Sequence, residues 1–280
     1  MISVNTNVAS MAAIQNLAAT GRDLAASQKA VSTGKKVADV ADNGAIWVIA
    51  NKMGGDLKSY DRVRESATRA GAILDTAVSA AESIMDRLND MKGKALAAIQ
   101  PGLSTSSLNA LNADFVQLRD QITTSVANAT FDGANMIGTT PASAISLGDA
   151  NGGNTITIAG VNLNLGQSTI TVAANATLDT TGTAAGVTAN TTILNAINTS
   201  IGNLGTEMAR LGAGAKRFDA HLQFVSKLQD ALTTGIGSMV DADLAGESAK
   251  LQSLQVKQQL GLQALSIANA GVQSALALFR

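Results

Sequence analysis

The chain has 280 residues but no cysteine, only two prolines and only 2% aromatic residues. Without cysteine it forms neither a disulfide bond nor a thiolate metal site. Proline averages about 5% of residues in proteins, and its scarcity favours long helices because an internal proline breaks the helical hydrogen-bond pattern. Apolar residues make up 46% of the chain and are mainly alanine and aliphatic residues, which suits helices packed closely through small side chains.

Charge is also scarce. Charged residues make up 15% of the chain, and the formal net charge is -1 at pH 7. A nucleic-acid-binding domain carries a strongly basic face. No nucleic-acid partner is therefore expected.

Residues suited to catalysis are few. His221 is the only histidine and lies between Ala220 and Leu222 in a helical pattern, where we expect a structural role. One histidine without cysteine leaves little for nucleophilic triad chemistry. Asp241 and Asp243 lack the further acidic ligands of a calcium loop and are predicted to cap the last helix. We expect no enzyme activity, no cofactor and no bound metal.

Both ends of the chain lack charge. Residues 1–21 and 258–279 contain no Asp, Glu, Lys, Arg or His. A membrane-spanning helix needs about 20 predominantly apolar residues, and amides such as Asn7, Gln259 and Gln263 interrupt both segments. No membrane partner is expected. Because the cores of protein interfaces are depleted in charge, each end is predicted to be buried against protein.

Two arrangements would bury these ends. In one, a bundle within a single subunit covers both of them. In the other, the two ends pair and their outer faces pack against further copies of the chain. A pair of helices retains outer faces, and here those faces carry amides, serine and alanine but no charge, so packing against further copies is favoured.

A seven-residue repeat defines the predicted contact between the ends. Leu17, Leu24 and Val31 recur every seven residues, which is typical of a coiled-coil seam. The interleaved positions of this pattern are Ile14, Gly21 and Gln28. At the other end the seam is predicted to include Leu262, Leu265, Val272 and Leu276. The complete set of predicted assembly residues is Val4, Val8, Met11, Ile14, Leu17, Leu24, Val31, Leu244, Leu251, Leu254, Leu262, Leu265, Val272, Leu276 and Phe279.

A long rod is predicted between residues 60 and 98. Apolar residues recur there at alternating spacings of three and four, and charged residues fall between them. At 1.5 Å per residue this helix is about 58 Å long. Pro101-Gly102 ends it, and the stretch from Ser104 to Ser107 supplies cap residues for a second helix that folds back as a helical hairpin. The helical period returns at Ile193 and Ile197. The predicted rod core contains Leu74, Ile84, Leu88, Met91, Phe115, Leu211, Phe218 and Leu222.

The middle of the chain has a different pattern. Residues 131–190 are rich in Gly, Thr, Asn and Ala and contain few charges. Residues 155–165 alternate in polarity, which predicts a β-hairpin with its turn near Ala159-Gly160. The segment is too short and glycine-rich for an independent catalytic domain, so we interpret it as a β-rich flap on the rod.

These patterns predict a mainly α fold. We expect a long antiparallel helical bundle or coiled coil with paired N- and C-terminal helices and a small insertion that contains a β-hairpin. Residues 1–44 with 240–280 would form a terminal-helix domain, which includes a polar connecting loop at residues 35–44. Residues 45–130 with 191–239 would form the rod, and residues 131–190 the flap.

Four segments resemble bacterial flagellin. They are ISVNTNVASMAAIQNL (2–17), VSTGKKVADVADNGAIWVIANKM (31–53), LGAGAKRFDAHL (211–222) and the closing helix of residues 240–280 with its Leu-Phe-Arg ending. The resemblance covers roughly residues 1–130 and 190–280 and holds at both ends in the right order. It implies a filament in which the terminal helices form the inner tube, the rod forms a second shell and the middle faces outward.

The resemblance also implies partners and a location. Other flagellin subunits, the flagellar type III export apparatus, an export chaperone, the filament cap and hook-junction proteins are implied, in an extracellular filament used for swimming. Export by that route agrees with an N-terminus that lacks the features of a cleavable secretory signal. A hook–filament junction protein is the nearest alternative, since such proteins resemble flagellin at their termini.

Two departures from the family pattern stand out. Many flagellins carry an Arg-rich, Glu-containing motif that a mammalian Toll-like receptor recognises, and this chain has Asp90 and Gly93 in that region. A weak response in receptor reporter cells is therefore expected. Trp47 replaces a small or aliphatic residue, and a packed aromatic side chain is expected there.

Two further classes of function remain alternatives. A membrane-interacting coiled coil would need Lys or Arg on the polar face of the C-terminal helix, and residues 258–279 have none. An enzyme confined to the flap is the weakest alternative.

Overall fold

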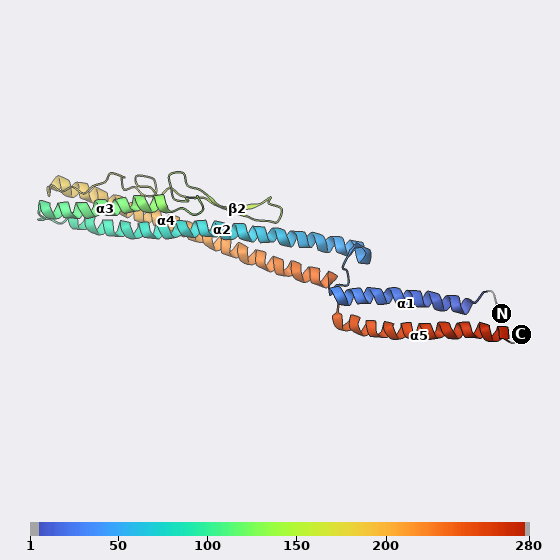
Figure 1. Cartoon of the computed structure of the whole chain (residues 1–280). Coiled ribbons are helices and arrows are strands. Elements are labelled where there is room, and N and C mark those ends of the chain that lie inside the picture. Colours follow the sequence, from blue (N-terminus) through green and yellow to red (C-terminus); the bar gives the residue numbers. More distant parts are fainter. Residues whose placement is uncertain (1–5, 278–280) are drawn as a thin grey trace. The chain divides into compact units, whose positions relative to one another are not determined.

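A computed structural model describes residues 6–277, with side chains up to residue 270. The chain divides into two compact units, Met1–Leu57 with Asp230–Arg280 and Lys58–Gln229, and each is described by itself. Within the described residues the elements are α1 (Val8–Thr33), α2 (Val40–Ala98), α3 (Thr105–Asn128), β1 (Ala144–Leu147), β2 (Thr155–Ile158), α4 (Ala184–Val240) and α5 (Leu244–Ala277) (Figure 1). The predicted mainly α fold is confirmed.

In the unit Lys58–Gln229, the predicted period of α2 coincides with its buried face. Every position of the apolar run from Val63 to Ala98 is buried, whereas Tyr60 at its start is half-exposed. Helices α3 and α4 complete the core. Each large aliphatic or aromatic side chain buried there contributes about 1.5–3 kcal/mol to the stability of the fold. Of the predicted rod core, Leu74, Ile84, Leu88, Met91, Phe115, Leu211 and Phe218 are at most 1% exposed, and Leu222 is half-buried.

The turn between α2 and α3 follows the local sequence. Gly102 adopts a positive φ of 86°, which favours glycine because it has no Cβ. Ser104 Oγ then accepts a hydrogen bond of 3.1 Å from the amide of Ser107 and satisfies a free N–H at the start of α3. The predicted serine cap is confirmed.

The flap contains one antiparallel hairpin, but its turn lies elsewhere than predicted. β1 pairs with β2 in a register that places Ala144 opposite Ile158 and Leu147 opposite Thr155. Asp149 Oδ1 accepts the amide hydrogens of Asn151 and Gly153 and so closes the turn between the strands.

The predicted turn at Ala159-Gly160 is therefore wrong. Gly160 serves a close approach instead: a Cβ on it would lie 2.3 Å from the carbonyl oxygen of Ala142 and 2.5 Å from that of Met136. The glycine lets two stretches of the flap backbone pack against each other, a tertiary requirement that a turn pattern does not distinguish.

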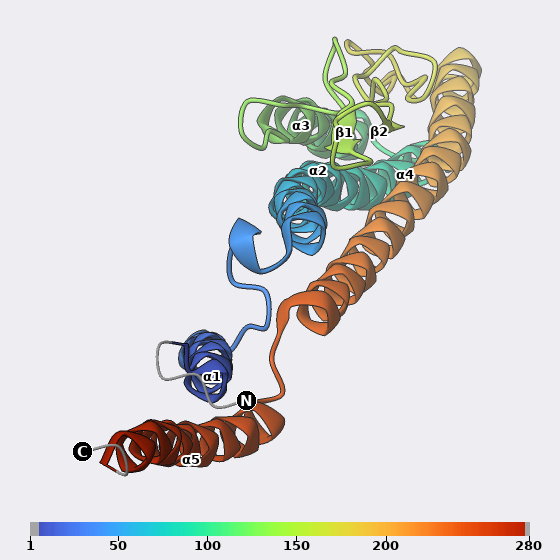
Figure 2. The same cartoon turned by 90° about the vertical axis from the view of Figure 1, so that its right-hand side faces the viewer.

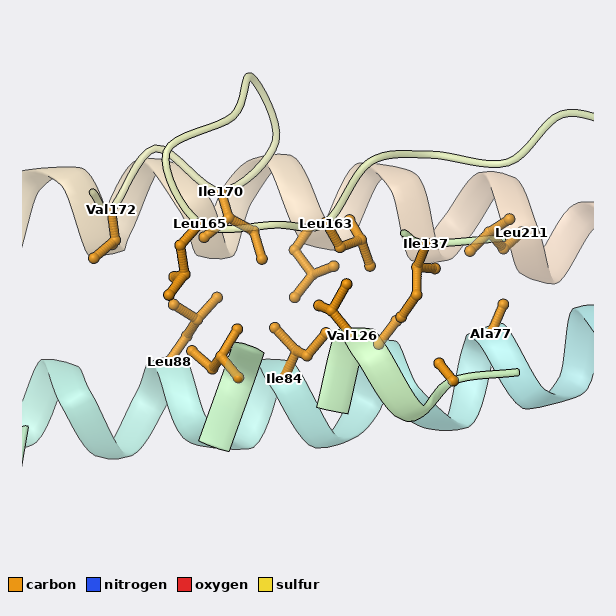
Figure 3. Packing of buried hydrophobic residues seen from close by; sticks show 14 of the residues in the cluster. Ala77, Ile84, Leu88, Val126, Ile137, Leu163, Leu165, Ile170, Val172 and Leu211 are labelled. Atoms are coloured by element: carbon orange, nitrogen blue, oxygen red, sulfur yellow. The ribbon is translucent and has the colours of Figure 1, made fainter. Parts of the chain in front are cut away.

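Beyond the hairpin the flap is mostly irregular, and side chains hold it against the bundle. Leu163, Leu165 and Ile170 point toward Ile84 and Leu88 of α2 (Figure 3). These apolar contacts attach the flap along the helices of its unit (Figure 2).

Polar side chains on the helices bind the flap backbone directly. Asn190 of α4 is 1% exposed; its Oδ1 accepts from the amide of Asp179 at 2.7 Å, and its Nδ2 donates to the carbonyl of Asp179 at 3.1 Å. Ser66 Oγ accepts from the amide of Leu147, and Asn112 Oδ1 accepts from the amide of Leu178. Because an unpaired buried backbone group is costly, these bonds allow a flap with little regular structure to be buried.

The unit Met1–Leu57 with Asp230–Arg280 contains α1, α5 and parts of α2 and α4. Loop residues 34–39 follow α1, and α2 is broken at Asn43, which has a φ of −161° and a ψ of 99°. A small core forms from Val37, Ala50 and Val240, against which Trp47 packs. Trp47 is therefore a packed aromatic side chain, as expected.

Candidate assembly surface

The terminal helices α1 and α5 lie side by side and run antiparallel (Figures 1 and 2). Asn7, which precedes α1, donates from Nδ2 to the carbonyl of Ala268 at 2.9 Å. Near the other end of the pair, Ser27 hydrogen-bonds to Glu247. We call the faces of these helices that point away from each other the assembly surface.

The seam of α1 follows a 3–4 spacing that differs partly from the predicted one. Leu17, Leu24 and Val31 are half-buried as expected. The interleaved positions are Ala13, Thr20 and Ser27. The predicted Ile14 and Gln28 are exposed, Ile14 by 52%, so their assignment to the seam is wrong. Small side chains at the interleaved positions allow the two helices to approach closely.

The seam of α5 also follows a heptad spacing. Leu254 is 6% exposed, and Leu251 and Leu265 are half-buried. Leu262 is 54% exposed, so its predicted place in the seam is wrong. Its neighbour Gly261 occupies the seam instead, and a Cβ on Gly261 would lie only 3.2 Å from Leu17 Cδ1. Between residues 244 and 270 of α5, the buried or half-buried positions are Glu247, Leu251, Leu254, Gln258, Gly261, Leu265 and Ala268.

Among the described side chains of the terminal helices, eight large apolar ones are uncovered in the single chain. Large side chains there are between 50% and 73% exposed: Val8, Met11, Ile14, Leu244, Val256, Leu260, Leu262 and Ile267. Exposed large apolar side chains that gather on one surface mark interaction sites in soluble proteins.

Four predicted assembly residues cannot be located by side chain. Val4 and Phe279 lie outside the described residues. Val272 and Leu276 belong to α5, in the part whose side chains the structure does not describe.

Polar contacts that the sequence pattern did not indicate hold the α1–α5 pair at the end where α1 finishes and α5 begins. The amide of Ala242 donates to the carbonyl of Gly34 at 2.9 Å, and that of Lys36 to the carbonyl of Val240 at 2.8 Å. The two connecting segments are thus tied together by their backbones. The periodicity of the sequence carries no signal for such contacts, because they join residues about two hundred positions apart.

The side chain of Lys29 binds two carboxylates at the end of the loop that follows α1. Lys29 Nζ lies 2.6 Å from Asp39 Oδ2 and 2.8 Å from Asp42 Oδ1. The carboxylate of Asp42 also accepts the amide hydrogens of Ala38 and Asp39. Charge-assisted bonds of this kind fix a short loop, although exposed ion pairs add little to stability.

Lowering the pH is expected to weaken the contacts at this end of the α1–α5 pair. The hydrogen bond from Ser27, followed by that from Lys250, lowers the pKa of Glu247 below its ordinary 4.5, and the bond from Lys29 lowers the pKa of Asp39 and Asp42 below 3.8. A carboxyl with a lowered folded-state pKa stabilises the fold above its ordinary pKa, and that stabilisation is lost as the pH falls through the lowered value.

Amide hydrogen exchange checks this expectation. Between pH 6 and pH 3, protection of α1 should fall relative to that of α3, which serves as an internal reference in the other unit. The Glu247→Gln variant should lose the part of this pH dependence that Glu247 carries. An α1-to-α3 protection ratio that stays constant over this range would contradict the expectation.

The remaining candidate residues have structural contacts. His221 Nε2 lies 3.1 Å from the carbonyl oxygen of Leu147, and its ring stacks on Phe224 with centroids 6.5 Å apart. Asp243 Oδ1 accepts from the amide of Ala245 at 3.1 Å and so caps α5 as predicted, whereas Asp241 pairs with Lys35 in a β-bridge.

Asp90 and Gly93 lie on α2 and line a groove against α3. The ion pair between Lys94 and Asp114, 2.7 Å long, crosses this groove. Asp90 itself pairs with Arg87 at 3.4 Å.

Two kinds of site are absent from the described residues. No group of three or more His, Cys, Asp or Glu side chains is placed there to hold a metal ion. Nor does that part of the chain contain a helix with the length and apolar content that crossing a membrane requires.

Comparison with known proteins places the chain. Residues 4–140 match the bacterial flagellin N-terminal helical region, and residues 194–279 match the bacterial flagellin C-terminal helical region. Flagellin FljK of Caulobacter vibrioides is 43% identical over 99% of this chain and 98% of its own length. The flagellin of Brucella melitensis is 34% identical over the whole of both chains.

A solved structure shares the fold. The putative flagellar hook-associated protein from Vibrio parahaemolyticus aligns with a TM-score of 0.60 over 71% of this chain and 100% of that one. At 12% identity this likeness concerns the fold alone and does not favour a hook-associated role. The matches to both family regions and to full-length relatives show that the chain belongs to the bacterial flagellin family.

Proposed function

We propose that this chain is the structural subunit of an extracellular bacterial flagellar filament. The observation that carries the proposal is the assembly surface. Val8, Leu260 and Ile267 are more than half exposed there, and they lie in residues 1–21 and 258–279, which contain no charge. Such a surface is unfavourable in water and becomes favourable when further copies cover it. Polymerisation is thus the activity of the molecule, and its family is structural rather than enzymatic.

The three parts of the chain take different places in this proposal. Residues 1–44 with 240–280 form the filament core, residues 45–130 with 191–239 form a surrounding shell, and residues 131–190 lie outermost. Support comes from charge, because residues 1–21 and 258–279 lack it while α2 carries charged residues between its buried positions. The assembly residues chosen from the sequence serve the core contacts.

Partners other than the subunit itself follow from the same proposal. The flagellar type III export apparatus, an export chaperone, the filament cap and the hook-junction proteins would each meet the chain on its way to the filament. Asp90 and Gly93, exposed on α2, would weaken recognition by the mammalian flagellin receptor. No observation favours a hook–filament junction protein over a filament subunit.

Seeded polymerisation tests the proposed function. Purified full-length chain is mixed with short filament fragments of the same protein and examined by electron microscopy. We expect long filaments, with α1 and α5 innermost in a helical reconstruction. A chain that stays monomeric with seeds, or a filament with the flap at its centre, would overturn the proposal.

A further inference from the structure

Helix α5 has two apolar sides, and one of them faces away from α1. At 3.6 residues per turn, Val256, Leu260 and Ile267 form one stripe, and all three are more than half exposed. The opposite side, which meets α1, includes Glu247 and Gln258 among its leucines. The side that meets α1 carries Leu251, Leu254 and Leu265, so each side has three large aliphatic residues. Hydrophobic burial alone therefore does not decide which side turns inward.

Polar contacts favour the observed orientation. Ser27 is 1% exposed, and it hydrogen-bonds to the Glu247 carboxylate and also approaches the Glu247 carbonyl at 3.5 Å. At the far end of the pair, Asn7 Nδ2 reaches the carbonyl of Ala268. Both contacts require that the side of α5 bearing Glu247 and Ala268 faces α1.

The fit of small residues agrees with this orientation. Gly261 leaves room for Leu17, whose Cδ1 would lie 3.2 Å from a Cβ at that position. Leu260, the next residue, is rotated by about 100° around the helix and is 57% exposed. A change in the rotation of α5 would bring Leu260 against α1 instead.

We propose that Ser27 and Glu247 form a polar lock that sets the rotation of α5 against α1. The lock thereby keeps Val256, Leu260 and Ile267 on the assembly surface; this consequence rests on the proposed filament function. Ser27 is buried, and turning Leu260 toward α1 would carry Glu247 away from it. The Ser27 hydroxyl would then lose this acceptor, and a buried polar group without a partner is penalised. Polar seam residues specify helix pairing in coiled coils in the same way.

The surroundings of Glu247 are compatible with this role. Lys250, one turn along α5, lies 3.3 Å from its carboxylate. The hydrogen bond from Ser27 lowers the pKa of Glu247, while Asp243 at the start of α5 opposes its charged state. Lys250 belongs to the same helix and turns with it, so it does not select an orientation; Ser27, on α1, does.

Intramolecular disulfide formation tests the lock, because the natural chain has no cysteine. Two full-length variants are compared before and after polymerisation: Leu17→Cys with Gly261→Cys, and Leu17→Cys with Leu260→Cys. A disulfide needs a Cα–Cα distance of about 4.4–6.8 Å. We expect the first pair to form a disulfide and the second to form at least about fivefold less of it, the ratio that roughly 1 kcal/mol of hydrogen-bond energy supports.

Substitutions in the lock then distinguish a rotation of α5 from a separation of α1 and α5. Ser27→Ala should lower the yield of the first disulfide about fivefold and raise that of the second, because Glu247 loses its donor on α1. Glu247→Gln keeps an acceptor and should leave both yields unchanged. Ser32→Ala, at an exposed serine of α1, is the matched control and should also leave them unchanged.

Three results overturn the lock. One is equal formation of the two disulfides in the parent background. Another is a Ser27→Ala variant that keeps the original preference. The third is loss of both disulfides in that variant, which would mean that the helices merely separate. Sedimentation measures polymerisation separately: a parent chain that stays monomeric yet shows the preference and its reversal contradicts the filament function and supports the lock.

Discussion

Deletion of residues 258–280 is expected to abolish polymerisation and leave a soluble monomer whose α2–α3–α4 bundle is intact. The deletion removes the half-buried Gly261, Leu265 and Ala268 from the seam and the exposed Leu260 and Ile267 from the assembly surface. Because α1 then lacks most of its partner, neither the pair nor its outer face forms. Among the described side chains, the buried core of the bundle unit contains none from this segment.

Sedimentation and electron microscopy measure the loss of filaments, and thermal unfolding followed by circular dichroism measures the bundle. The expected outcome is no sedimenting material together with a bundle transition near that of the full-length chain. Filaments formed by the truncated chain would contradict the assignment of the terminal helices as the assembly surface.

A single charge gives a sharper form of the same test. Leu260→Lys on α5 and Ile145→Lys in the flap alter aliphatic residues that are 57% and 55% exposed. Both should fold normally, because neither side chain is buried. Only Leu260→Lys should block assembly, since it would place an unpaired charge in a buried contact between copies. Equal assembly of the two variants would contradict this expectation.

Replacement of Phe218 by alanine is expected to lower the free energy of unfolding by about 3–5 kcal/mol. Phe218 lies on α4, is 1% exposed and belongs to the core of the bundle unit. The substitution removes the burial energy of a large apolar side chain. It also leaves a cavity, because the surrounding helices cannot move enough to fill the space.

Phe224→Ala on the same helix is the matched control. Phe224 is 58% exposed and contacts the ring of His221, so its loss should cost only about 0.5–1 kcal/mol. Urea unfolding of both variants measures the two changes. A loss at Phe224 as large as that at Phe218 would show that the core assignment is wrong.

The rod was the most predictable part of the fold. From Val63 to Ala98 every predicted position of α2 is buried, because small and aliphatic residues alternate with charges that must stay in water. The serine cap at Ser104 and the stop near Pro101 are local chemistry and were also predictable. Such features depend on residues a few positions apart.

The terminal helices were predictable in character but not in orientation. Leu17, Leu24 and Val31 lie in the seam as expected, but Ile14 and Leu262 do not. Each helix has apolar residues on more than one side, so periodicity does not decide which side turns inward. The inward side is decided by the hydrogen bond between Ser27 and Glu247 and by the close packing of Leu17 on Gly261.

The flap shows the same division. Its low charge and alternating strand β2 were evident, but the partner strand β1 and the turn at Asp149 were not. The amides and carbonyls of the irregular part are paired by side chains such as Asn112 and Asn190 of distant helices. No local pattern encodes those pairings.

The sequence by itself determined a charge-free pair of chain ends, a long helical rod, the absence of cysteine chemistry and membership of a family recognised at both termini. The tertiary structure alone decided which sides of α1 and α5 meet and how the flap attaches. The physical reason is that helix formation and burial follow from short-range periodicity, whereas the rotation of a helix with apolar residues on several sides depends on individual contacts between residues far apart in the chain.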